Sequence, residues 1–113
     1  MSQPSAGGDR RILLTFRLVG EVLALDVARV HEIIDPLPDT PVPRADPFAP
    51  GLINVRGTVV PVLDLRRRLG LPPAERTEES RMIVLDMPLR EESVKIAVEA
   101  DAVDQVAEIA ASA

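Results

Sequence analysis

The residues best suited to a specific interaction lie in one apolar stretch, residues 51–65. Asn54, Arg56 and Asp64 interrupt this stretch, and Gly57 follows the arginine directly. Because glycine adopts positive φ angles without steric cost, the Arg-Gly-Thr step predicts a tight turn between two strands. Such a turn would place Arg56 at the tip of a hairpin, where a guanidinium can clamp a carboxylate of a partner protein.

Each of these polar residues also has an ordinary structural interpretation. An arginine at a hairpin tip is often only solvated, and Asn54 could simply satisfy backbone groups beside the turn. Val30 and Glu32, further upstream, fit a helix core position and a solvated helix face. From the residues alone, both interpretations stay open.

Patterns typical of catalysis or metal binding are not found. His31 is the single histidine, the chain has no cysteine, and no second ligand accompanies the histidine at metal-binding spacing. Ser80 and Ser93 lack the context of a nucleophile elbow, and Gly7-Gly8 lacks the strand and the Lys-Ser/Thr step of a phosphate loop. We therefore expect no enzyme activity and no cofactor or metal. Phosphotransfer on His31 is the enzymatic alternative.

Composition narrows the class of protein and of partner. Of the 113 residues, 46% are hydrophobic but only 2% are aromatic, so one modest core of Val, Ile, Leu and Ala is expected. The net charge of −5 argues against a general nucleic-acid binder. No run approaches the roughly 20 apolar residues that span a bilayer, and the N-terminus has no signal-like apolar core, so we expect a cytoplasmic protein.

Strands are expected to form most of the scaffold around the hairpin. Residues 12–18 alternate apolar and polar side chains, and residues 22–25 are expected to return as the second strand of a hairpin. Residues 35–50 contain six of the eleven prolines, which predicts an extended, partly strand-like connector. Residues 81–87 are apolar enough for a strand buried on both faces, and residues 94–98 are expected to pair with it.

Two short helices are also expected. Asp26 is a candidate N-cap for residues 27–34, in which apolar side chains recur at helical spacing. Asp64 is a candidate N-cap for residues 65–69, and the glycine that follows suits the left-handed position past a helix end. In the final segment, residues 101–109, apolar side chains are spaced by three, which fits either a helix or a bent strand.

Several of these segments occur in an order found in a known family. They are Phe16-x-Leu18-x-Gly20-Glu21, Val30-His31-Glu32-Ile33, Thr40-Pro41-Val42-Pro43, the block Gly-x-x-Asn-x-Arg-Gly-x-x-x-Pro-x-x-Asp-Leu at residues 51–65, and Asp101-x-Val103-x-x-Val106-x-x-Ile109. In this order the chain resembles the CheW-like chemotaxis coupling proteins, a family of adaptors. The resemblance covers residues 12–109, and the block at residues 51–65 is its most specific part.

The resemblance implies an all-β fold with short helices, built as two small five-stranded β-barrel subdomains. Family members normally continue for some tens of residues beyond the last matching segment, so the second barrel is expected to be incomplete. The expected divisions are a disordered leader at residues 1–10, a CheW-like domain at residues 11–109, shortened at its C-terminus relative to the family, and a tail at residues 110–113.

The resemblance also implies a non-catalytic adaptor that couples chemoreceptors to the chemotaxis histidine kinase. The implied partners are the cytoplasmic tip of a methyl-accepting chemoreceptor and the regulatory domain of the kinase, with no nucleic acid and no direct membrane insertion. The partner-binding residues carried over to matching positions are Val30, Glu32, Gly51, Asn54 and Arg56. The alternative is an oligomerisation or strand-complemented structural module, which would self-associate or bind a partner through the incomplete second barrel.

Overall fold

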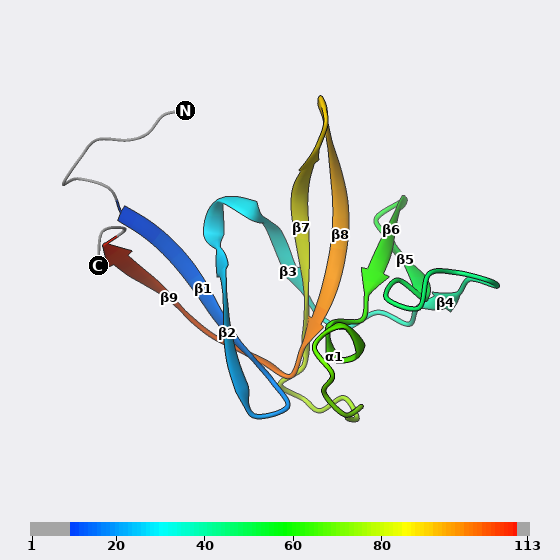
Figure 1. Cartoon of the computed structure of the whole chain (residues 1–113), viewed down its shortest axis with the longest axis horizontal. Helices are drawn as coiled ribbons and strands as arrows, with labels where there is room; N and C mark the ends of the chain where they lie inside the picture. Colours follow the sequence, from blue (N-terminus) through cyan, green and yellow to red (C-terminus); the bar gives the residue numbers. More distant parts are fainter. Residues whose placement is uncertain (1–9, 111–113) are drawn as a thin grey trace.

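A computed structural model describes residues 10–110, and these form two sheets (Figure 1). The smaller sheet has the order β2 (Glu21–Asp26), β1 (Arg10–Leu18) and β9 (Ala102–Ala110). The larger sheet has the order β3 (Val30–Ile34), β7 (Arg81–Leu89), β8 (Glu92–Ala100), β6 (Thr58–Leu63), β5 (Gly51–Val55) and β4 (Thr40–Pro41). The prediction of a mainly β fold in two parts is confirmed. Apart from residues 10 and 110, the expected leader and tail lie outside the described residues.

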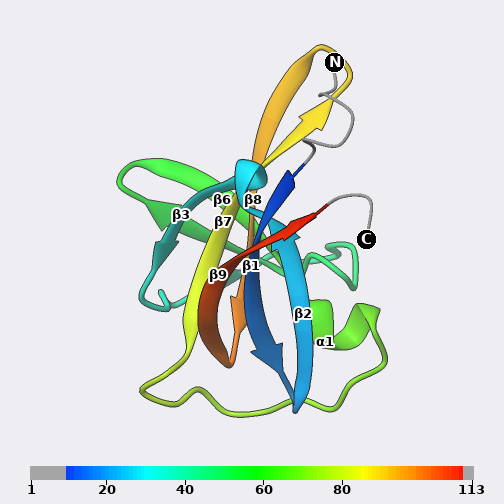
Figure 2. The ribbon, with the colours of Figure 1, turned by 90° about the vertical axis from the view of Figure 1, so that its left-hand side faces the viewer.

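The smaller sheet joins strands from the two ends of the described chain (Figure 2). Strands β1 and β2 pair antiparallel and are joined by a two-residue turn at Val19 and Gly20, whose φ angles are 51° and 81°. This confirms the predicted hairpin. Strand β9 pairs antiparallel with the other edge of β1, so the final segment is a strand and not a helix.

The predicted helix at residues 27–34 is wrong beyond its first turn. Asp26 does act as an N-cap, because its carboxylate accepts a hydrogen bond from the Ala28 N–H at 2.9 Å. The 3₁₀ helix η1 that follows covers only Val27–Arg29, and β3 then pairs antiparallel with β7. Exposure alternates along β3, which is the period of a strand, and its β-branched side chains favour that conformation.

Residues 82–85 of β7 are buried on both faces, so the prediction made for residues 81–87 holds for the middle of that segment, and they separate two apolar clusters. The hairpin cluster consists of Ile53, Val55, Val60, Val62, Met82, Val84 and Ala97. The inter-sheet cluster consists of Leu14, Phe16, Ile83, Leu85, Val98 and Ala100. Figure 1 shows β7 and β8 standing between the smaller sheet and β4–β6. The antiparallel pair β7–β8 therefore contributes side chains to both clusters.

The segment from β5 to the first helix has the predicted form. Strands β5 and β6 pair antiparallel, and the two residues between them are Arg56 and Gly57. Helix α1 (Leu65–Arg68) begins at Asp64, whose carboxylate accepts a hydrogen bond from the Arg67 N–H at 3.1 Å. The α1 helix ends with a glycine in the left-handed conformation, which completes the expected C-cap. Upstream, the proline-rich connector contributes β4, which pairs with β5.

The last two strands of the described chain belong to different sheets. Strand β8 lies inside the larger sheet, between β7 and β6, whereas β9 joins the smaller one. The smaller sheet thus depends on pairing between the beginning and the end of the described chain, which no local pattern reveals.

Candidate partner-binding site

The tip of the β5–β6 hairpin presents a single long cationic side chain. Arg56 has a φ angle of 49° and Gly57 one of 91°, as in a type I′ turn, which suits the twist of a two-residue hairpin. The Arg56 side chain is 69% exposed. Asn54 Oδ1 accepts a hydrogen bond from the Gly57 N–H at 2.7 Å. Asn54 therefore braces the turn that holds the arginine outward.

Glu32 on β3 forms an ion pair with Arg56, in which Nη2 of the arginine donates to Oε2 of the glutamate. The Glu32 side chain is only 21% exposed. Strand β3 is one edge of the larger sheet, and three strands stand between it and β5 in the sheet order. The ion pair therefore requires the sheet to curl until β3 and the hairpin tip meet. Two residues that the family resemblance nominated separately are joined here by an ion pair.

A chain of charged side chains continues from Glu32 along the same surface. The His31 ring lies between two carboxylates, with Nδ1 3.2 Å from Asp86 Oδ2 and Nε2 3.7 Å from Glu32 Oε2. Lys95 Nζ donates to Asp86 Oδ1 at 3.1 Å, and this bond is the main cause that lowers the pKa of Asp86. A small cavity of about 130 Å³ adjoins His31, Glu32, Arg56 and Lys95.

The other two nominated residues lie apart from this unit. The β3–β7 register shifts between Val30 and Glu32, so Val30 packs against the inter-sheet cluster while Glu32 reaches the hairpin tip. Such a bulge redirects side chains that regular alternation would place on one face. Gly51 is buried at the opposite end of β5, where an added methyl group would lie 2.8 Å from Asp39 Oδ2. The structure thus unites Glu32, Asn54 and Arg56 only.

The CheW-like domain family model matches residues 13–113. This chain belongs to that family. It is 41% identical over 73 residues to "Chemotaxis protein CheW" of Bacillus subtilis, which covers 65% of this chain and 47% of that protein. It is 34% identical over 93 residues to "Probable chemotaxis protein CheW" of Rhizobium etli, covering 82% and 58% of the two chains. The chain therefore spans about half the length of the curated relatives it matches.

A solved structure supports the fold of this CheW-like domain. The crystal structure of the scaffolding protein TtCheW from Thermoanaerobacter tengcongensis superposes with a TM-score of 0.79 at 30% sequence identity. The match covers 92% of this chain and 68% of that one. The two-sheet arrangement is therefore that of the CheW-like family.

Two charged residues beside the hairpin tip were not singled out from the sequence. Asp86 and Lys95 face each other across the β7–β8 pair and complete the row of charges that begins at Arg56. The available signal was the single carboxylate inside the apolar run at residues 81–87. The Asp86 side chain is 35% exposed, so burial does not force it to pair, and the sequence does not show which of the many cations lies opposite it.

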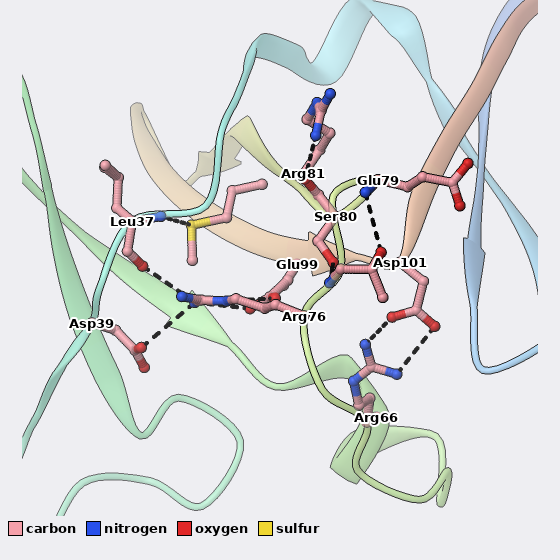
Figure 3. A network of polar contacts seen from close by, with 11 residues as sticks. Leu37, Asp39, Arg66, Arg76, Glu79, Ser80, Arg81, Glu99 and Asp101 are labelled. Carbon is pink, nitrogen blue, oxygen red and sulfur yellow. Dashed lines mark hydrogen bonds and ion pairs between the residues drawn. The ribbon is translucent and has the colours of Figure 1, made fainter.

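A second ion pair fixes the scaffold behind the site (Figure 3). Arg66 of α1 donates to both carboxylate oxygens of Asp101, and its side chain is only 15% exposed. Asp101 Oδ2 also accepts a hydrogen bond from the Val19 N–H at 2.7 Å. The arginine is the main cause that lowers the pKa of Asp101. This cluster ties α1 to the β1–β2 turn and to the junction of β8 and β9.

A third cluster holds the proline-rich connector against the larger sheet (Figure 3). Arg76 Nε donates to Glu99 Oε2 at 2.8 Å, and Arg76 Nη2 donates to the Leu37 carbonyl oxygen at 3.2 Å. The bond to Glu99 is the main cause that raises the pKa of Arg76. The connector is therefore attached by a side chain from the loop that precedes β7.

The described part of the chain offers neither a cluster of metal ligands nor a membrane-spanning helix. Within residues 10–110, no group of three or more His, Cys, Asp or Glu side chains is arranged to hold a metal ion. The helices in the same range are too short and too polar to cross a membrane.

Proposed function

We propose that this CheW-like domain is a non-catalytic cytoplasmic adaptor that couples chemoreceptors to the chemotaxis histidine kinase by protein contacts. Membership of the family supports the proposal, as do relatives named chemotaxis proteins and a structural neighbour described as a scaffolding protein. The observation that carries it is the exposed guanidinium of Arg56, braced by Glu32 at the tip of the β5–β6 hairpin.

The geometry of the tip suits a protein contact. Only Nη2 of Arg56 is engaged by Glu32 among the described residues, so the remaining N–H groups of the fork can donate to a partner's carboxylate or carbonyl oxygen. The ion pair and the short turn restrict the side chain before the partner arrives. Less conformational entropy is then lost on binding than for a free arginine. We propose that this tip contacts the chemoreceptor.

The nominated residues divide into two roles under this proposal. Glu32, Asn54 and Arg56 form the contact unit, because the ion pair and the turn join them. Val30 and Gly51 influence the unit through the backbone. Val30 lies at the bulge of β3, and the absence of a side chain at Gly51 lets β5 approach Asp39 closely. The kinase regulatory domain would bind elsewhere, through exposed apolar strand surfaces.

A pull-down with receptor signalling tips and the kinase regulatory domain tests the proposal. The folded chain should retain both, and Arg56→Ala should weaken retention of the receptor only. Arg17→Ala is the matched control, because Arg17 is 60% exposed and pairs with Asp104 at 3.1 Å, so it loses the same charge and a similar ion pair. If the folded parent chain retains neither partner, the adaptor proposal fails.

The edges of the smaller sheet favour a second candidate, a strand-complemented structural module. Among the described residues, β2 and β9 each have a strand on one side only, and Val22 on β2 is exposed. An unpaired edge can accept a strand from another chain. Sedimentation at several protein concentrations discriminates the candidates. A monomer at every concentration contradicts self-complementation, whereas a dimer that excludes the receptor supports it over the adaptor.

A further inference from the structure

The single histidine of the chain is the extra residue of the bulge in β3. Val30 pairs with Leu85 and Glu32 pairs with Val84, so His31 falls between two register positions. Consecutive residues of a regular strand point to opposite faces, whereas a bulge re-aims a side chain. His31 and Glu32 accordingly line the same cavity of about 130 Å³. The bulge therefore places a titratable ring beside the glutamate of the hairpin-tip ion pair.

The neutral His31 ring has one N–H group and one lone pair. Nδ1 lies 3.2 Å from Asp86 Oδ2, and the hydrogen bond from Lys95 to Asp86 is the main cause that lowers the pKa of this carboxyl. Because an ionised carboxylate only accepts hydrogen bonds, the neutral ring carries its proton on Nδ1. The lone pair of Nε2 then faces Glu32 Oε2 at 3.7 Å, and these two acceptors form no hydrogen bond.

Protonation of the ring makes Nε2 a second donor, and this donor faces Glu32. The same Oε2 atom of Glu32 already accepts from Nη2 of Arg56. The imidazolium and the guanidinium then share one acceptor oxygen and repel each other as like charges. Among the described side chains, Glu32 supplies the carboxylate that lies within 4 Å of Arg56. Protonation of His31 therefore weakens the contact that braces the arginine.

The charged groups around His31 come from four parts of the fold. Glu32 lies on β3, Asp86 on β7, Lys95 on β8, and Arg56 at the β5–β6 turn. With the ring neutral, the two cations balance the two carboxylates, and protonation leaves an excess of positive charge. The Nδ1–Asp86 contact is the same in both forms of the ring. The change is therefore confined to Glu32 and Arg56.

We propose that His31 is a proton-sensitive switch of the hairpin tip, in which the protonated ring competes with Arg56 for Glu32 and loosens the arginine. Histidine changes its charge between about pH 5 and about pH 8, which includes the physiological range. The competition is a property of this chain alone, and its consequence for binding rests on the proposed receptor contact. A loosened arginine loses more conformational entropy on binding, so the receptor contact should weaken as the pH falls.

NMR of the isotope-labelled full chain tests the competition without a partner. The ring signals of His31 and the guanidinium ¹³C signal of Arg56 are followed from about pH 8 to about pH 5. The Arg56 signal should change with the same midpoint as the ring, and this change should be absent in His31→Gln. The Arg17 guanidinium is the control, because it pairs with Asp104 at 3.1 Å and not with the carboxylates that face the histidine.

The coupling is reciprocal, so removal of the arginine should make the ring easier to protonate. Arg56→Gln should raise the midpoint pH of the His31 ring signals by roughly a few tenths of a unit, and Glu32→Gln should lower it. Arg17→Gln removes the same charge from another exposed ion pair and should leave the midpoint unchanged. In a Glu32→Gln background, Arg56→Gln should also have no effect, because the contested oxygen is gone.

Receptor retention at two pH values gives the functional readout. The parent chain should retain receptor signalling tips about twofold to fivefold less at about pH 6 than at about pH 8. His31→Gln should retain them equally at both. Equal pH dependence of the two chains would overturn the switch.

Two NMR outcomes would also overturn it. One is an unchanged His31 midpoint in Arg56→Gln, and the other is an equal shift in Arg56→Gln and Arg17→Gln, which would indicate a general charge effect. A folded parent chain that retains the receptor at neither pH contradicts the adaptor proposal instead. The NMR midpoints then still decide the competition, so the two proposals fail on different measurements.

Discussion

Two arginine–carboxylate pairs of this CheW-like domain have the same chemistry but different surroundings. The Arg56–Glu32 pair joins an exposed hairpin tip to the edge strand β3. The Arg66–Asp101 pair is less exposed on the arginine side and joins α1 to the junction of β8 and β9. Exposed pairs contribute little to stability because water solvates and screens both partners. We infer that the first pair serves recognition and the second holds the fold together.

The additional contacts of Asp101 strengthen this contrast. Asp101 accepts from Arg66 and from the Val19 N–H, and its own N–H donates to the Arg17 carbonyl oxygen at 2.8 Å. Val19 has a φ angle of 51°, which is unfavourable for a β-branched residue. The aspartate therefore stabilises a strained turn and two sheets together, whereas Glu32 bonds one exposed side chain. The two regions therefore differ more in the number of backbone groups that bond to the carboxylate residue than in the ion pair itself.

The largest effect is expected from removing the carboxylate of Asp101. Asp101→Ala leaves Arg66 partly buried without its partner and the Val19 N–H without its acceptor, and should lower the free energy of unfolding by roughly 2–3 kcal/mol. Urea denaturation measures this loss. Asp104→Ala, which removes the pair with exposed Arg17, should cost less than about 1 kcal/mol. Equal losses in the two variants would contradict the contrast between the pair with a partly buried arginine and the pair with an exposed one.

Acid should weaken the same cluster. The pKa of Asp101 is lowered in the folded state, chiefly by its hydrogen bond to Arg66, relative to about 3.9 in an unfolded chain. The stabilisation is therefore complete above that unfolded pKa and is lost as the pH falls through the lower folded pKa. Unfolding free energies measured from about pH 5 downward should fall more steeply for the parent chain than for Asp101→Asn. Parallel curves would show that Asp101 does not contribute to the acid dependence.

The sequence predicted the hairpins well because their turns are local. The observed turns at residues 19–20 and 56–57 both end in glycine, and apolar runs that favour strands flank them. The start of α1 and its N-cap at Asp64 were predicted equally well. Each of these features depends on a few neighbouring residues, whose preferences for φ angles and hydrogen bonds are known from the residue type alone.

The features that the sequence did not predict depend on contacts between residues far apart in the chain. Residues 27–34 satisfy helical spacing as well as strand alternation, and pairing with β7 decides for the strand. The Glu32–Arg56 pair requires the curl of the larger sheet and the bulge of β3, neither of which has a local signature. For the same reason the pairing of β1 with β9 was not foreseen. The tertiary context, not the propensity, determines these elements.

A smaller loss of stability is expected from the turn that carries Arg56. Gly57 has a φ angle of 91° with open space around the position of a side chain, so Gly57→Ala meets backbone strain but no steric clash. We expect a loss of about 1 kcal/mol in urea denaturation. Gly51→Ala provides the opposite case. The backbone at Gly51 does not have a positive φ angle, but the added methyl group would clash with the Asp39 side chain. If Gly57→Ala is neutral, the type I′ geometry of the tip is wrong.

The smallest effect on stability, together with the largest on binding, is expected from the exposed pair itself. Arg56→Asn removes the guanidinium but places at φ 49° a residue that tolerates this conformation, so stability should stay within about 0.5 kcal/mol of the parent. Glu32→Gln removes the partner and keeps the side-chain shape. A double-mutant cycle in urea should give a coupling energy below about 1 kcal/mol.

In the receptor pull-down the same cycle should be strongly non-additive, because either substitution disables one shared unit. Additive binding losses would show that Glu32 contacts the receptor independently and does not act by positioning Arg56.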